Sequence, residues 1–217
     1  ATTEIYTLSL HDALPIFYHD TASKPHYAGC RALTGLPADE NTACRATLII
    51  SGIDGSILQT LVVRNPATNS SPSGGPTALS EMPPIAMDID GDGRVDLVSG
   101  TEVWMQNASG GFDFAWQLPR AVNDTAVADL DGDGKAEIIH LRSSGEGNQD
   151  DRGIFIYSYD GQLKRRIPLG TYWFTPLTIA DVDGDGRSDI VLCADGTVYA
   201  FRDDGRPIWA YVVPPDV

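Results

Sequence analysis

A nine-residue acidic segment occurs three times in this 217-residue chain, beginning at Asp88, Asp129 and Asp181. Each copy carries carboxylates at positions 1, 3, 5 and 9 and glycines at positions 4 and 6. Four like charges in nine residues repel one another unless a cation lies among them, and Ca²⁺ accepts about six to eight oxygen ligands in a flexible shell. Glycine adopts the positive φ angles that fold such a loop inward. The repeat therefore predicts three metal-binding loops.

The predicted ligands of each loop are its four carboxylates and the main-chain carbonyl at position 7. Position 9 of the second loop is Glu137, whose longer side chain can still reach an ion. Plain Asp-Gly hairpin turns would account for one copy but not for three with matched carboxylates. We predict about three calcium ions. Their ligands are Asp88, Asp90, Asp92, Arg94 and Asp96 in the first loop, Asp129, Asp131, Asp133, Lys135 and Glu137 in the second, and Asp181, Asp183, Asp185, Arg187 and Asp189 in the third.

The loops do not fit the helix–loop–helix calcium motif. That motif needs a bidentate glutamate at position 12, where this chain has Ser99, His140 and Leu192. Short apolar runs rich in β-branched residues flank the loops, as in Ile190-Val-Leu after the third. Such runs are typical of strands. Each loop is therefore predicted to join two β-strands.

The spacing of the loops predicts a repeat architecture. The loops begin 41 and 52 residues apart, a period typical of propeller blades. Turns rich in Asp and Gly predict two further strands after each loop, and the upstream hairpin 46–63 has the same pattern. We predict an all-β partial β-propeller with about three four-stranded blades and part of a fourth, truncated at the N-terminus. The segments are 17–83 (partial blade with a loop insertion and a linker), 84–120, 121–172 and 173–217.

Residues 1–16 stand apart from this pattern. They lack the basic start and the small-residue cleavage site of a signal peptide, and they resemble the in-frame translation of a sequencing adapter. We predict that they are an artefact of assembly and that the protein's own sequence starts near Phe17. A native signal sequence is then missing with the preceding part.

Composition excludes some partners and leaves others open. The formal net charge of −15 argues against a nucleic-acid partner, and no apolar run approaches the roughly 20 residues of a membrane span. Cys30 and Cys44 flank a polar loop, where a disulfide and two thiols remain alternatives. Cys193 is predicted to be a small buried residue. The candidate general bases have no identifiable partner and no catalytic motif, so no catalytic residue is predicted; they are His19, His26 and His140.

The Asp-x-Asp-Gly-Asp-Gly-x-x-Asp loops between strands resemble the FG-GAP repeats, also called VCBS or integrin-alpha-type propeller repeats. The resemblance extends from Pro84 to the C-terminus and depends on the loops and the blade pattern. It implies a calcium-binding β-propeller that is extracellular, on the cell surface or periplasmic. Such domains serve as binding or adhesion platforms for a carbohydrate or protein ligand.

Two functions follow from this resemblance. The first is a non-catalytic binding module in which calcium is structural. The second is the propeller part of a calcium-dependent polysaccharide lyase or another secreted carbohydrate-active enzyme. Such lyases use Ca²⁺ to neutralise a uronate carboxylate while a base removes a proton. Because protein oxygens are predicted to saturate the metal sites of the loops, the sequence favours the first function and no enzymatic activity within this chain.

Overall fold

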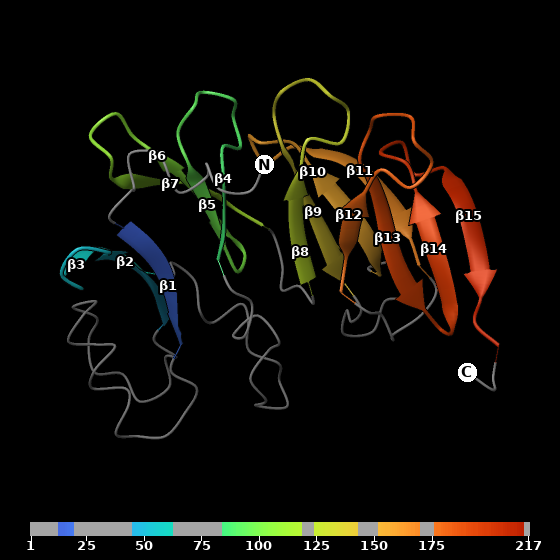
Figure 1. The fold of residues 1–217 in the computed structure, drawn as a ribbon, viewed down its shortest axis with the longest axis horizontal. Coiled ribbons are helices and arrows are strands. Elements are labelled where there is room, and N and C mark those ends of the chain that lie inside the picture. The colour runs from blue at the N-terminus through green and yellow to red at the C-terminus, as the bar shows by residue number, and fades with distance from the viewer. Residues whose placement is uncertain are drawn as a thin grey trace. The chain divides into compact units, whose positions relative to one another are not determined.

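The chain is all-β wherever its structure is described. The computed structural model describes residues 13–19, 45–62, 84–118, 124–142, 152–169 and 176–214. Those residues form fifteen β-strands and no helix, so none of them lies in a helix that could span a membrane. The predicted all-β fold class is confirmed for this part of the chain (Figure 1).

The strands form four antiparallel sheets, each of which follows the order of the chain. The first sheet has three strands, β1 (Ala13–His19), β2 (Arg45–Ser51) and β3 (Ile57–Val62). The other three sheets have four strands each, as propeller blades do. Their strands are β4 (Ile85–Met87), β5 (Asp96–Ser99), β6 (Glu102–Gln106) and β7 (Phe112–Gln117); β8 (Asp124–Ala128), β9 (Glu137–Arg142), β10 (Gly153–Tyr157) and β11 (Leu163–Pro168); and β12 (Thr178–Ala180), β13 (Asp189–Ala194), β14 (Thr197–Phe201) and β15 (Pro207–Val212).

The sheets belong to two compact units, which we describe separately. The first unit holds the sheet β1–β3 and most of the sheet β4–β7. The second holds the sheets β8–β11 and β12–β15 together with residues 88–92 of the first acidic loop.

Strand β1 lies partly within residues 1–16. Its pairing with β2 runs from Ala13 opposite Ser51 to His19 opposite Arg45. The sheet therefore includes residues 13–16, which the sequence analysis assigns to an assembly artefact. The strand lies at the edge of its sheet, a position that tolerates Pro15 because an edge strand needs fewer main-chain donors.

Three sheets carry a β-bulge at the same place after an Asp-Gly turn. In the sheet β8–β11, Ile156 pairs with Arg165 and Tyr157 with Leu163, which leaves Lys164 as the extra residue. The extra residues of the other two sheets, Leu58 on β3 and Ile208 on β15, also lie three residues after the turn glycine. A β-bulge changes the direction of the side chain of its extra residue relative to a regular strand. The extra residue can therefore point toward different neighbours in each sheet.

The core of the first unit joins its two sheets. Trp104 and Phe112 pack there with apolar residues of β2, β3 and β5. The Trp104 and Phe114 rings meet edge to face with centroids 5.5 Å apart, a favourable aromatic geometry. The Gln59 side chain donates to the Phe112 carbonyl and accepts from its amide, both at 2.8 Å. Apolar contact and paired hydrogen bonds together fix the two sheets of this unit.

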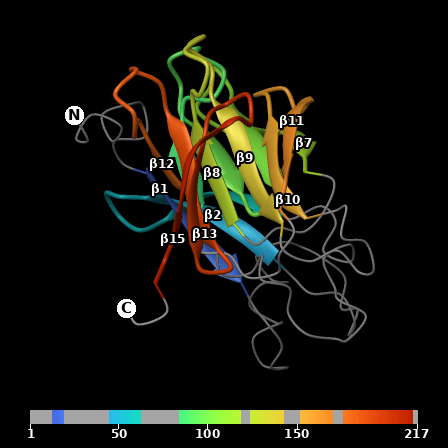
Figure 2. The ribbon, with the colours of Figure 1, turned by 90° about the vertical axis from the view of Figure 1, so that its right-hand side faces the viewer.

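The second unit buries one continuous core between the sheets β8–β11 and β12–β15. Figures 1 and 2 show these sheets side by side, and the Leu177 amide donates to the Asp124 carboxylate across them. Burial of each large aliphatic side chain contributes about 1.5–3 kcal/mol. The fully buried aliphatic side chains of this core include Ile139 and Leu141 of β9, Ile154 and Ile156 of β10, and Ile190 and Leu192 of β13.

Gly153 is the first residue of β10 and has no room for a side chain. Its φ is +137°, and an added Cβ would lie 2.1 Å from the Ile167 carbonyl oxygen. We expect Gly153→Ala to lower the free energy of unfolding by about 2 kcal/mol or more, as measured by urea denaturation. Gly196→Ala is the matched control, since its φ is +71° but its Cβ would meet open space; we expect it to cost about 1 kcal/mol. Equal losses would contradict the steric argument.

Candidate metal centres

Each acidic loop joins the first strand of a sheet to its second strand. The loops connect β4 to β5, β8 to β9 and β12 to β13, as the sequence predicts. The glycine at position 4 has φ +78° in all three loops, a conformation that residues with a Cβ rarely adopt. At Gly91 a Cβ would also lie 2.8 Å from the Gly134 carbonyl oxygen. The three loops therefore share one backbone path.

The carboxylate at position 1 holds each loop from inside. In the third loop, Asp181 accepts hydrogen bonds from the amides of Gly184 at 2.7 Å and Gly186 at 2.9 Å. Asp129 accepts the equivalent amides of the second loop, also at 2.7 and 2.9 Å. In the first loop the Gly91 amide donates to Asp88 at 2.9 Å. These bonds curl the backbone around the carboxylate, as in an Asx turn.

The carboxylates at positions 1, 3 and 9 converge in every loop. One oxygen from each lies within 4.8 Å of the other two. The carboxylate at position 9 is buried each time, with 1% exposure at Asp96, 3% at Glu137 and 1% at Asp189. The three clusters are Asp88, Asp90 and Asp96; Asp129, Asp131 and Glu137; and Asp181, Asp183 and Asp189.

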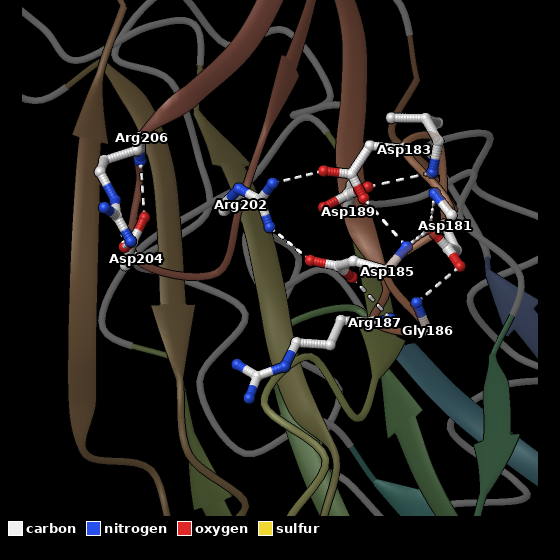
Figure 3. A network of polar contacts seen from close by, with 11 residues as sticks. Asp181, Asp183, Asp185, Gly186, Arg187, Asp189, Arg202, Asp204 and Arg206 are labelled. Atoms are coloured by element: carbon white, nitrogen blue, oxygen red, sulfur yellow. Dashed lines mark hydrogen bonds and ion pairs between the residues drawn. The ribbon is translucent and has the colours of Figure 1, made fainter.

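The other predicted ligands lie outside these clusters. The carboxylates at position 5 do not belong to the converging clusters. Two of them accept hydrogen bonds from main-chain amides of their own loop. Asp133 accepts from the Lys135 amide at 2.8 Å, and Asp185 accepts from the Arg187 amide at 3.0 Å. In Figure 3 the Arg187 side chain points away from the carboxylates. The position 5 carboxylates and the position 7 carbonyls remain predicted ligands.

Main-chain amides anchor the buried carboxylate at position 9. The Val182 amide donates to Asp189 and the Leu130 amide to Glu137, each at 3.0 Å. These are equivalent bonds, because each joins position 2 of a loop to position 9. In the first loop Asp96 accepts from the Gln106 amide at 2.8 Å. The buried oxygens are thereby oriented before any ion binds.

A cationic side chain contacts the carboxylates of the second loop, and another contacts those of the third. The Lys164 ammonium lies 2.7 Å from Asp131 and 2.9 Å from Glu137. Burial alone would lower the Lys164 pKa, but the hydrogen bonds and negative charges of both carboxylates outweigh it and raise the pKa. In the third loop the Arg202 guanidinium bonds to Asp183 and Asp185 (Figure 3). This contact lowers the pKa of Asp185.

The donor set of each cluster fits a hard divalent cation. All the converging atoms are carboxylate oxygens, the ligand type that Ca²⁺ prefers. A buried carboxylate beside two others is costly unless positive charge compensates it. Lys164 and Arg202 supply such charge in the second and third loops. The clusters could therefore hold a hard divalent cation.

His140 is a core residue of β9. Its side chain is 1% exposed, and Nδ1 lies 3.3 Å from the Thr125 hydroxyl. Burial, with a smaller effect of the nearby Arg142 charge, lowers its pKa to about 3. Such a histidine stays neutral and is unsuited to act as a base at a solvent-filled site. His26 and the side chain of His19 lie outside the described residues.

Cys30 and Cys44, for which a disulfide and two thiols are alternatives, lie outside the described residues. Cys193 lies on β13 and is half-buried, less enclosed than the sequence predicts. Side chains alternate between the two faces along a strand, so Cys193 and its register partner Val198 on β14 lie on the opposite face of the sheet from Ile190 and Leu192. That face does not contribute to the core between the two sheets.

Comparison with known proteins finds one matching family and two related enzymes. Residues 88–140 match the FG-GAP-like repeat, a stretch that includes the first two loops. The chain is 34% identical over 90 residues to rhamnogalacturonan endolyase YesW of Bacillus subtilis strain 168, and 34% identical over 91 residues to rhamnogalacturonan exolyase YesX of the same strain. Each alignment covers 36% of this chain, but only 14% of YesW and 15% of YesX.

The crystal structure of rhamnogalacturonan lyase YesW resembles this chain in fold. The TM-score is 0.56 with 19% sequence identity. The superposed region covers 79% of this chain and 32% of the YesW chain. The described sheets thus follow a fold that is found in part of a longer lyase.

The buried His140 predicts a pH dependence of stability. Its folded pKa of about 3 lies below the unfolded value of about 6.5, so below pH 6.5 the unfolded chain binds a proton that the folded chain does not. Stability therefore falls as the pH decreases from 6.5, by about 2 kcal/mol at pH 5 from this group. Urea unfolding from pH 7.5 to 5 at fixed ionic strength measures it.

The control for this prediction is His140→Phe, which keeps an aromatic ring in the core and removes the titrating group. The variant should lose this part of the pH dependence. Parallel pH profiles of the two proteins would contradict the assignment, whatever the absolute stability of the variant.

Proposed function

Since residues 88–140 of this chain belong to the FG-GAP-like repeat family, we propose that it is a calcium-stabilised propeller module of a secreted carbohydrate-active protein. One observation carries the calcium role. The same three carboxylate positions converge in all three loops, and the third carboxylate is buried each time. A chance cluster of acidic turns would not repeat both features.

Calcium in these loops has a structural role. Positions 1 and 3 lie in the loop, whereas position 9 is the first residue of the second strand of each sheet. These first residues are Asp96 of β5, Glu137 of β9 and Asp189 of β13. An ion held by all three ties the path of the loop to the start of that strand. Because one short segment supplies the ligands of each site, the three ions bind independently. Position 5 carboxylates and position 7 carbonyls complete the shell toward the six to eight oxygens that Ca²⁺ takes.

The whole protein is proposed to be a polysaccharide lyase that acts on an acidic, rhamnogalacturonan-type polymer. Sequence identity to the lyases YesW and YesX supports this proposal. It favours the enzyme alternative over an adhesion module. The chain covers a small part of both relatives, so the catalytic groups are assigned to no residue here. An extracellular or periplasmic location fits such a substrate and the millimolar calcium at which extracellular modules bind.

Calcium removal tests the structural role. At a calcium concentration 100 times the dissociation constant, each site adds about 2.7 kcal/mol to the free energy of unfolding. We therefore expect a higher melting temperature in calcium than in EGTA, as measured by circular dichroism. Asp183→Asn should lose the response of one site and retain the others. A melting curve that is the same in calcium and EGTA would contradict structural calcium.

Binding to polysaccharide tests the role of the module. We expect the chain to migrate more slowly in a native gel that contains rhamnogalacturonan than in one that contains neutral dextran, because the proposed ligand is an acidic polymer. Product formation is followed in parallel as ultraviolet absorbance of unsaturated uronate. Equal migration in both gels would remove the carbohydrate role from this chain. Product formation would instead place catalytic groups within it.

A further inference from the structure

The cationic side chains of the second and third loops contact different carboxylates. Lys164 binds positions 3 and 9, Asp131 and Glu137, which both belong to the converging cluster. Arg202 binds positions 3 and 5 of its loop, Asp183 and Asp185 (Figure 3). Its contacts therefore include only one member of the converging cluster. The lysine contacts two members of the converging cluster, one of them the buried Glu137, whereas the arginine contacts one member and the exposed Asp185.

Lys164 contacts a carboxylate that is buried, that of Glu137. Glu137 is 3% exposed and directs one oxygen to the Leu130 amide and the other to the Lys164 ammonium. The equivalent Asp189 accepts from the Val182 amide. An ammonium 2.9 Å from a buried carboxylate neutralises it as an ion would. In the second loop, the Lys164 side chain therefore compensates the negative charge of the buried Glu137 carboxylate.

The β-bulge of β11 places the lysine. Lys164 is the extra residue of that bulge, so its side chain is not constrained by a register partner. The equivalent bulges carry Leu58 and Ile208. The hairpin therefore forms with an apolar residue at this position, and the ammonium is not needed to make the bulge.

A small cavity beside the second loop gives the ammonium room to leave. Its walls include Asp131, Glu137 and Lys164, and Asp203 from the turn between β14 and β15 lines it as well. The Lys164 side chain is 36% exposed. A lysine stem is flexible and its head group is readily hydrated, so the ammonium can withdraw while the sheet stays intact.

We propose that Lys164 is a built-in competitor for calcium at the second loop, which therefore binds calcium more weakly than the third loop and remains ordered without it. This inference rests on the proposed calcium role of the loops. Calcium binding there requires the ammonium to withdraw from Glu137 and Asp131. The second and third loops then respond to calcium over different concentration ranges, although their backbones follow the same path.

Isothermal titration of the full 217-residue chain with calcium in metal-free buffer tests the proposal. We expect Lys164→Met, which keeps the length of the stem, to tighten one site by about tenfold, since the charge count of a site sets its affinity. Arg206→Met is the matched control, because it removes the same charge from an exposed ion pair with Asp204. It should leave all sites unchanged. Adding Glu137→Gln to Lys164→Met should abolish the gained site, while the amide oxygen can still accept from Leu130.

The outcomes separate this proposal from the calcium role itself. If the wild type binds calcium and Lys164→Met behaves as Arg206→Met does, Lys164 is not a competitor and the calcium role stands. A tightened site that persists in the Glu137→Gln double variant would place the effect at another loop and overturn the assignment. If no protein binds calcium at millimolar concentration, both proposals fail.

Discussion

Repulsion among converging carboxylates is the constraint on which this structure depends. Each acidic loop brings three of them within 4.8 Å and buries the one that begins the second strand. Such an arrangement is unstable without positive charge. Main-chain amides contribute part of the compensation, and Lys164 and Arg202 contribute more in two of the loops. A bound calcium ion is the proposed source of the remainder.

The loops and the cores perform separate tasks in the fold. A loop fixes the path from one strand to the next within a sheet through local bonds, as Asp181 does with the Gly184 amide. Contact between sheets comes from apolar side chains that are distant in sequence, such as Ile139 and Ile190 in the second unit. Under the proposed calcium role, metal binding would stabilise individual sheets through these local bonds and would leave the core between them in place.

The chain is similar to a small part of two rhamnogalacturonan lyases. YesW and YesX are much longer than the part that this chain matches, and the buried, neutral His140 is unsuited to proton abstraction. In the proposed function, the described residues form a scaffold and calcium bound in the acidic loops stabilises its sheets. The polymer chemistry proposed for the whole protein requires groups that are not assigned in this chain.

The sequence by itself determined the all-β class, the three loops and their position between strands, because matched carboxylates, paired glycines and apolar runs are local signals. It did not determine which carboxylates meet, since position 5 turns toward its own backbone at Asp133 and Asp185. Only the tertiary structure placed Lys164 in the second cluster, because a residue 27 positions beyond Glu137 reaches it through a bulge on another strand. It also decided that His140 is enclosed, since burial depends on how sheets pack and not on the neighbours of a residue in the chain.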